Sequence, residues 1–506
     1  MRAVEGTLAA ALTLRGAEVH ALLCDEVLPA CLECQQNAFP EAVTFATMGP
    51  QNNLCVACYS PALRAYTDLD VTVHTLGRLL SSEAREAATA EMRAVPLDRV
   101  PDFRRRDVGV GEHAMAGALR FFARGTLLDD PVHKAVLRRF LLAALLTQDA
   151  MDRLLDQIDF DVVVFNHGIY VPHGIVGDCV RRRGVRVVNW AVAYRKQSFI
   201  FSHGDTYHHT LISEPVETWT DMRWSEAHEK AIVDYLKSRW TGSGDWVWFF
   251  EKPIHDLGAI TASLGLDLDR PTIGLLTNVF WDAQLHYPRN VFDDMLQWIL
   301  ETIAWFAERP DLQLLIRVHP AEIRGTLPSR QPIVEEIAKV WPRLPANVVV
   351  VPPEADVSTY PLMLACDAAL IYGTKMGTEL TSMGIPVIVA GEAWIRGKGV
   401  THDAQDRAHY FELLGRLPFG GRLNAETVAR ARRYAYHFFF RRMIPWKFME
   451  DRSGRWPPFM PKLDTIADLA SGRDAGLDLV CDGILDGTPF VHPAEELMRD
   501  EQGGCP

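Results

Sequence analysis

Short apolar runs alternate with amphipathic segments along most of the chain, and this alternation predicts an α/β fold with parallel sheets. In the second half, helical patterns at residues 292–307 and 333–340 separate the apolar runs. The runs that predict buried strands are residues 273–276, 312–318, 348–351, 368–372 and 386–389. Together these segments indicate a doubly wound, Rossmann-like domain.

The first half follows the same alternation less regularly. Residues 161–165 and 185–190 predict strands, and residues 61–157 are mostly helical in pattern. A doubly wound domain normally opens with a strand, but residues 5–15 predict a helix ahead of the first predicted strand, residues 18–23. Either the first strand is missing from the sequence or the sheet starts differently.

We therefore expect two Rossmann-like domains and a C-terminal appendage. Residues 1–245 form the predicted N-terminal domain, which carries a cysteine-rich insertion. Residues 246–420 form the predicted C-terminal domain, and residues 421–506 are expected to add helices and a tail.

A small-residue turn in the second domain is the strongest candidate for a binding site. Residues 366–391 predict a strand, a tight turn that begins with Gly373 and Thr374, a helix and a strand. Free backbone N–H groups at such a turn favour phosphate, and the hydroxyl groups of Thr374 and Thr378 add donors. Glu379, one turn further on, can accept hydrogen bonds from ribose hydroxyls. The alternative is an ordinary βαβ unit with a capped helix.

Two basic residues mark the end of the predicted strand 312–318. Ligands of open α/β sheets bind outside the carboxyl ends of the strands, where Arg317 and His319 are expected to lie. A helix start alone explains the Pro320 and Glu322 that follow, but it does not explain a histidine at this position. We therefore predict that His319 binds an anion.

Composition narrows the function classes. With 506 residues, 48% of them hydrophobic and 23% charged, the chain has ample core for a globular protein. The net charge is −13, whereas a nucleic-acid-binding protein is expected to have an excess of basic residues. The sequence has neither an apolar run of membrane-spanning length nor a signal peptide, which predicts a cytoplasmic protein and leaves peripheral membrane contact open.

The cysteines are concentrated near the N-terminus. Cys31 and Cys34 form one CxxC pair, and Cys55 and Cys58 form a second. Four thiolates at this spacing are typical of a structural zinc site, which would fix a loop. A disulfide is less expected in the cytosol, and free thiols or an iron–sulfur cluster are the remaining interpretations.

Several motifs of the second half together resemble one known family. Residues 317–320, 372–374 with Glu379, 384–387 and 397–403 resemble the bacterial capsule polysaccharide biosynthesis proteins, and residues 277–282 do so as well. The resemblance is best over residues 270–415. It implies the GT-B architecture, in which two Rossmann-like domains face a cleft. The family includes transferases for 3-deoxy-manno-octulosonic acid and other surface-polysaccharide sugars, and the cysteine cluster is not part of its general pattern.

This resemblance implies a glycosyltransferase whose second domain binds a nucleotide sugar linked to CMP, UDP or GDP. Arg317 and His319 would face the phosphates, Gly373 and Thr374 would cradle them, and Glu379 would hold the ribose. Positive groups at the leaving phosphate would make the chemistry independent of a metal. Asn278 and Asp282 would lie at the mouth of the cleft. The next loop would bring further residues to the base or the phosphate, namely Trp394, Arg396 and Lys398.

The acceptor side requires a base if the enzyme inverts the sugar's configuration. His167 directly follows the predicted strand 161–165, and Asp25 and Glu26 follow residues 18–23. His167 is the best placed of the three, with a loop or core histidine as the alternative. The expected acceptor is a glycan or another hydroxyl compound. Competing functions are a nucleotide-sugar 2-epimerase on the same fold and a non-catalytic scaffold in which the cysteines form an interaction module.

Overall fold

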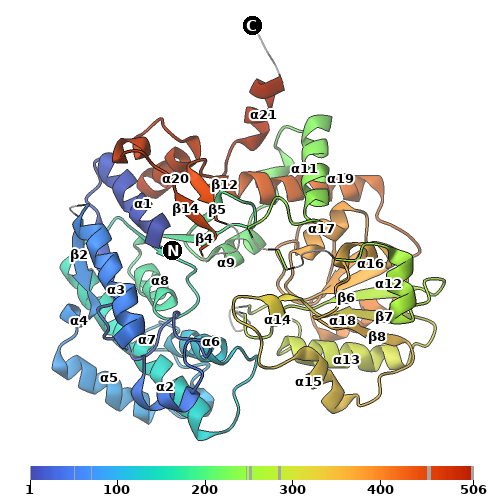
Figure 1. Ribbon diagram of the computed structural model, residues 1–506, viewed down its shortest axis with the longest axis horizontal. Helices are drawn as coiled ribbons and strands as arrows, with labels where there is room; N and C mark the ends of the chain where they lie inside the picture. The colour runs from blue at the N-terminus through green and yellow to red at the C-terminus, as the bar shows by residue number, and fades with distance from the viewer. Residues whose placement is uncertain are drawn as a thin grey trace. The chain divides into compact units, whose positions relative to one another are not determined.

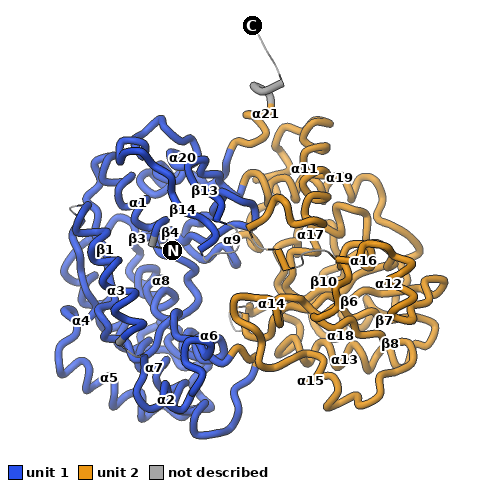
Figure 2. Tube along the Cα trace, viewed as in Figure 1, with its two compact units in different colours: residues 1–122, 126–210, 442–492 blue, residues 123–125, 211–441, 493–506 orange. Residues whose placement is uncertain are grey.

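The computed structural model of the protein describes residues 2–50, 52–69, 71–246, 248–249, 253–282, 287–452 and 457–502. The chain divides into two compact units (Figure 2). Unit 1 contains Met1–Phe122, Thr126–Thr210 and Arg442–His492, and unit 2 contains Ala123–Gly125, Leu211–Arg441 and Pro493–Pro506.

Unit 2 is built on a parallel six-stranded sheet in the order β11-β10-β9-β6-β7-β8. Strand β6 is the first strand of this sheet along the chain, and it lies between β7 and β9. The strand order therefore runs in opposite directions on its two sides, as in Rossmann folds. The strands are β6 (Thr272–Leu276), β7 (Gln313–Arg317), β8 (Val348–Val351), β9 (Ala368–Ile371), β10 (Val387–Val389) and β11 (His402–Asp403).

Helices cover both faces of this sheet (Figure 1). Leu314 of β7 packs into a core with helices α13 and α18, whereas its neighbour Leu315 packs into a second core with α12, α16 and α17. Successive strand residues point to opposite faces, so strands buried on both sides are apolar throughout. The helices of unit 2 are α10 (Glu217–Thr220), α11 (Glu226–Ser238), α12 (Leu257–Leu264), α13 (Met295–Ala307), α14 (Ala321–Arg324), α15 (Ile333–Val340), α16 (Thr359–Ala365), α17 (Met376–Ser382), α18 (Arg407–Gly415), α19 (Ala425–Tyr436), a π-helical turn (His437–Arg441) and α21 (Ala494–Gln502).

Unit 1 contains three sheets among its described residues. Strands β1 (His20–Leu23) and β2 (Thr72–Thr75) form a parallel pair. Strand β3 (Val162–Asn166) is parallel to β4 (Arg186–Val192), and β4 is antiparallel to β5 (Ser198–His203). Strand β5 in turn pairs antiparallel with β12 (Ile444–Pro445). Ahead of β1 lies the helix α1 (Arg2–Leu14), as the sequence pattern predicts. Strands β13 (Met449–Asp451) and β14 (Phe459–Pro461) pair with each other as a short antiparallel ribbon.

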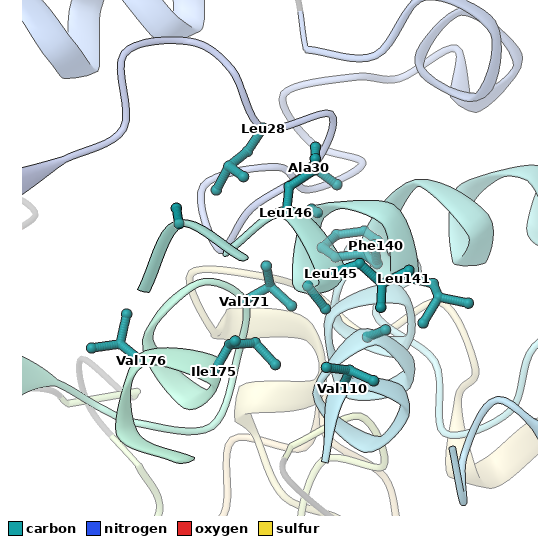
Figure 3. Packing of buried hydrophobic residues seen from close by; sticks show 14 of the residues in the cluster. Leu28, Ala30, Val110, Phe140, Leu141, Leu145, Leu146, Val171, Ile175 and Val176 are labelled. Carbon is teal, nitrogen blue, oxygen red and sulfur yellow. The ribbon is translucent and has the colours of Figure 1, made fainter. Parts of the chain in front are cut away.

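The core of unit 1 is largely helical. Figure 3 shows Val110 of α6, Phe140 and Leu141 of α7 and Ile175 of α8 in one apolar cluster. The helices of unit 1 are α2 (Ala42–Met48), α3 (Asn52–Thr67), α4 (Leu76–Leu79), α5 (Ser82–Ala94), α6 (Val110–Phe122), α7 (Pro131–Gln157), α8 (His173–Arg182) and α20 (Ala475–Asp486), with short 3-10 turns at Leu97–Arg99 and Ile466–Leu469, and α9 (Tyr207–Ser213) runs into unit 2.

The α/β class and the Rossmann-like strand order of unit 2 are confirmed, while the units divide differently from the predicted domains. Residues 211–245 belong to unit 2 because α11 packs against α19. Residues 442–492 return to unit 1, where β12 pairs with β5. The cleft that the GT-B resemblance implies stays a prediction. No helix in the described part of the chain is both long and apolar enough to cross a membrane.

Candidate functional site

The candidate site lies at the carboxyl ends of β6, β7 and β9 in unit 2. Strand β6 pairs with both neighbours at the point where the strand order reverses, which is where open α/β sheets bind their ligands. Asn278 follows β6, His319 follows β7, and Gly373 and Thr374 follow β9. The fold therefore brings together four residues that the sequence assigns to nucleotide binding.

His319 is a neutral hydrogen-bond donor rather than a cation. Its backbone N–H donates to the Thr277 hydroxyl at 3.0 Å, and its Nδ1 accepts a hydrogen bond from the Ala321 N–H at 3.0 Å. Burial, together with repulsion from Lys375 and Arg317, lowers the pKa of His319 to about 3. With Nδ1 accepting, the single ring proton lies on Nε2, which can donate to a phosphate oxygen.

Several buried polar atoms near these strand ends lack a hydrogen-bond partner among the described residues. They include the Asn278 side-chain oxygen, the Thr378 hydroxyl and Glu379 Oε1. Most buried polar atoms in proteins are hydrogen-bonded, so such exceptions point to a missing ligand or water. The Thr374 hydroxyl, in contrast, accepts a hydrogen bond from the Met376 N–H at 3.3 Å. Because α17 has only seven residues, the site depends on these side chains more than on a helix dipole.

Gly373 leaves open space at the turn. A Cβ atom added there would meet only the Glu392 carbonyl oxygen, at 3.8 Å, and Gly373 does not have a left-handed backbone. The fold thus tolerates a larger residue at position 373. If such a residue weakens nucleotide binding, the cause is a clash with the ligand and not a change in the fold.

We expect Gly373→Val to leave the melting temperature within a few degrees of the wild type. If a phosphate approaches the backbone at this turn, the same change will weaken nucleotide affinity tenfold or more through steric exclusion. Calorimetric titration of both proteins checks this, and equal affinities would place the ligand elsewhere.

Glu379 lies fully buried in a cluster of charged groups. Its Oε2 accepts a hydrogen bond from the Tyr360 hydroxyl at 2.7 Å and lies 3.1 Å from Arg239 Nε. Burial alone would raise the pKa of Glu379, but the charges of Arg239 and Lys375 and the hydrogen bond from Tyr360 hold it below its usual value. These partners occupy Oε2 of the carboxylate that the sequence assigns to ribose, and the whole side chain is buried, so we assign Glu379 no ligand contact.

The basic residues expected to reach the ligand instead hold loops together. Arg317 donates to the carbonyl oxygens of Pro352 at 2.6 Å and Ala355 at 3.2 Å, and burial lowers its pKa to about 10. Lys398 is buried and donates to the carbonyl oxygens of Ile212 and Glu214. We therefore do not assign Arg317 or Lys398 to the phosphates.

The other predicted residues of this region differ in exposure. Arg396 is buried and donates to the Gly391 carbonyl oxygen at 3.1 Å. Trp394 is also buried, and its ring packs against Phe438. Asp282 is exposed beyond β6. The exposure of Asp282 fits its predicted place at the mouth of a cleft, whereas the buried Trp394 and Arg396 are not accessible for the predicted contacts with base or phosphate.

His167 occupies a strained position at the end of β3 in unit 1. Its φ is +63°, in the left-handed region that non-glycine residues rarely adopt, and its N–H donates to the Trp190 carbonyl oxygen at 2.9 Å. Burial, with repulsion from Arg120 and His173, lowers the pKa of His167 to about 3. Its Nδ1 is buried without a partner among the described residues. Strain and an unpaired nitrogen are features of functional positions.

Asp25 and Glu26 follow β1, as predicted, but only one of them is exposed. Asp25 accepts a hydrogen bond from the Gly77 N–H at 2.7 Å and so holds the start of α4. Glu26 is exposed and has a φ of +68°. No hydrogen bond joins either residue to His167 in the part of the chain that the structure describes.

The cysteine cluster does not form a metal site in the described structure. Cys31 and Cys34 bring their sulfur atoms to 3.8 Å, which excludes a disulfide in this structure. Burial and the nearby Cys31 and Cys24 raise the pKa of Cys55 to about 11, while Cys58 is exposed. No group of three or more potential ligands among the described residues can hold a metal. Zinc at these four cysteines therefore lacks structural support, and free thiols match the described residues.

Sequence reasoning missed the groups that surround Glu379. Lys375 follows the Gly373–Thr374 turn directly, and its charge contributes to the lowered pKa of His319. Arg239 comes from the end of α11, in a segment predicted to belong to the other domain. The sequence signal that could have found Lys375 is its position inside the small-residue turn.

Comparisons with known proteins complete the description. No protein-family model and no curated protein sequence matches the chain. Among solved structures, KpsC β-Kdo 2,4-transferase from Thermosulfurimonas dismutans is 14% identical, covers 61% of this chain and 87% of its own, and has a TM-score of 0.39. The β-Kdo 2,7-transferase from the same organism is 12% identical over 56% and 79% of the two chains, with a TM-score of 0.33.

A structure of S. aureus MnaA with UDP is 11% identical over 57% of this chain and 72% of its own, with a TM-score of 0.28. Because all three TM-scores are below 0.5, these similarities do not assign a function. The functional proposal must rest on the residues of the two units.

Proposed function

We propose that the protein is a glycosyltransferase that moves a sugar from a nucleotide-sugar donor to a glycan or another hydroxyl acceptor. Unit 2 binds the donor, and unit 1 binds the acceptor. The observation that carries this proposal is the set of polar groups at the strand-order reversal of unit 2. There His319 offers a donor on Nε2, and Asn278 and Thr378 carry buried atoms without a partner among the described residues.

In the proposed reaction the donor's phosphate leaves with negative charge. Hydrogen-bond donors placed where that charge develops stabilise the transition state more than the ground state. The His319 Nε2–H and the Thr378 hydroxyl are such donors. Because the His319 ring is neutral, its hydrogen bond to the leaving phosphate does not require the ring to gain a second proton.

On the acceptor side, we propose that His167 takes the proton from the attacking hydroxyl. A base must be unprotonated, and the low pKa of His167 keeps the ring neutral at neutral pH. Its unpartnered Nδ1 is the nitrogen to which we assign this role.

A pH profile tests the assignment of His167. A free histidine would cause activity to fall below about pH 6.5, whereas a base with a pKa of about 3 leaves kcat/KM flat from pH 8 down to pH 5. We also expect His167→Asn to lower kcat by about 100-fold or more, because general-base catalysis contributes at least this much. A wild-type profile that falls near pH 6.5, or a His167→Asn variant with full activity, would exclude this role.

Turnover of nucleotide sugars tests the proposed function itself. We expect one member of a panel of CMP-, UDP-, GDP-, TDP- and ADP-sugars to release its nucleotide, faster with added hydroxyl acceptors, and His319→Ala to abolish this release. Isomerisation of the sugar nucleotide without an acceptor would identify an epimerase instead. Absence of any reaction or binding would favour a non-catalytic protein.

A further inference from the structure

Next to the candidate nucleotide site lies a network of buried charges. The side chains of Arg239 and Glu379 are 4% and 0% exposed, and Asp245 is buried beside them. Lys375, at 21%, is the charged member with the greatest access to solvent. Burying ions is costly unless they are paired, so these four groups must be considered together.

The contacts are specific. Arg239 Nη1 forms an ion pair with Asp245 and donates to the Tyr235 hydroxyl at 3.1 Å, while that hydroxyl donates to Asp245 at 2.8 Å. On its other side, Arg239 Nε lies 3.1 Å from Glu379 Oε2. The two cations, Arg239 and Lys375, thus balance the two carboxylates.

Lys375 makes the longer of the two cation contacts to Glu379. Its Nζ lies 3.5 Å from Glu379 Oε1, and that oxygen accepts no hydrogen bond from the described residues. Glu379 Oε2, in contrast, has Arg239 and the Tyr360 hydroxyl within 3.1 Å. If the Lys375 ammonium moves toward a ligand, Glu379 therefore keeps its ion pair with Arg239 and its hydrogen bond from Tyr360.

The position of Lys375 points to the nature of that ligand. It follows the Gly373–Thr374 turn at the end of β9 and lies close enough to His319 to repel its protonated form. A lysine ammonium is a compact point charge that binds phosphate, and a neutral histidine donor next to it suits the same anion.

We propose that Lys375 binds the phosphate of the nucleotide, and that Arg239 is a positioning residue that makes Lys375 available by compensating the charge of Glu379. This inference rests on the proposed function and assigns the phosphate-binding cation to Lys375 instead of Arg317 or Lys398. Without Arg239, Lys375 becomes the cation that must neutralise Glu379, and the ligand loses it.

Calorimetric titration of the full-length protein tests this role with two probes, the nucleoside diphosphate that binds best and inorganic pyrophosphate. We expect Lys375→Met to weaken both affinities tenfold or more and to reduce their dependence on salt. Lys339→Met is the matched control, because Lys339 is an exposed lysine of the same unit, paired with Glu336. It should bind both probes as the wild type does.

The Arg239 part of the proposal is tested by a rescue. Arg239→Gln leaves one excess negative charge in the network, and we expect affinity about tenfold weaker although Lys375 is intact. The double variant Arg239→Gln, Glu379→Gln restores the balance and should return to within about threefold of the wild type. If Arg239→Gln does not fold, the double variant decides alone: affinity as low as that of Lys375→Met overturns the role of Arg239.

The outcomes separate this inference from the proposed function. Nucleotide binding that depends on His319 but is unchanged in Lys375→Met would overturn the inference and leave the function standing. Pyrophosphate binding that depends on Lys375, without any nucleotide binding, would support the anion site and contradict the donor assignment. If the wild type binds neither probe, both proposals fail.

Discussion

We expect Arg239→Met to lower the free energy of unfolding by about 3–5 kcal/mol, the cost of removing one partner from a buried ion pair. The methionine would fill a similar volume but would leave Glu379 and Asp245 buried with one cation between them. Urea denaturation followed by circular dichroism measures the change, and the slope with denaturant should stay constant if the folded state is otherwise intact.

Arg407→Met is the control for this effect. Arg407 is an exposed residue of the same unit that pairs with Glu301 on the surface, so its loss should cost less than about 1 kcal/mol. Equal, small losses for both variants would show that the buried network contributes little to stability, and the electrostatic basis of the Lys375 proposal would weaken with it.

The second large effect concerns Glu322, a buried carboxyl at the start of α14. Its oxygens lie 3.2 and 3.3 Å from the Ile333 N–H, and it is 1% exposed. Burial raises the pKa of Glu322 from 4.5 to about 7, despite the hydrogen bond from Ile333. Between these two pH values the folded protein retains a proton that the unfolded chain has lost, so the free energy of unfolding falls as pH rises.

Glu322→Gln removes this dependence. At pH 8 we expect the variant to be more stable than the wild type by about 3 kcal/mol, since each unit of pKa difference corresponds to about 1.4 kcal/mol. At pH 4 the two proteins should differ by less than about 1 kcal/mol, because the wild-type carboxyl is then protonated in both states. Denaturation at both pH values, with the exposed Glu412→Gln as control, checks the sign. A wild type that is more stable at pH 8 than the variant would contradict it.

The sequence pattern predicted the strands of unit 2 well because parallel strands buried on both faces are continuously apolar. Five predicted strands correspond to β6 to β10 within a few residues, whereas β11 has only two residues and is too short to show a pattern. In unit 1 the first predicted strand is present as β1, but it pairs with β2 in a sheet separate from β3 and β4.

The site was predictable in its location and less so in its chemistry. A histidine after β7 and a small-residue turn after β9 are local signals, and the sheet order places them side by side. The direction of a long side chain is not a local signal. Arg317 turns back to the carbonyl oxygens of Pro352 and Ala355, because a buried guanidinium needs acceptors that only the folded loop supplies. Glu379 meets Arg239 from a helix far away in the sequence.

The C-terminal region shows the same limit. The acidic composition after Pro458 predicts a less ordered tail, but residues 475–486 form α20, which begins after the N-cap Asp474 and ends at the left-handed Gly487. The buried Leu477 and Ile484 anchor it to unit 1. Short amphipathic helices such as this one are stabilised by the partner surface, which the sequence pattern does not reveal.

The measurement that tests the central claim most directly is nucleotide binding by the wild type and two variants of His319. His319→Asn keeps an acceptor for the Ala321 N–H but removes the Nε2 donor, and His319→Ala removes both. In a thermal-shift panel of CMP, UDP, GDP, TDP and ADP, we predict that one nucleotide stabilises the wild type. At 100 times its Kd the gain is about 2.7 kcal/mol, and both variants should lose most of it. If no nucleotide stabilises the wild type, or if the variants respond as it does, the assignment of unit 2 as the donor-binding unit is wrong.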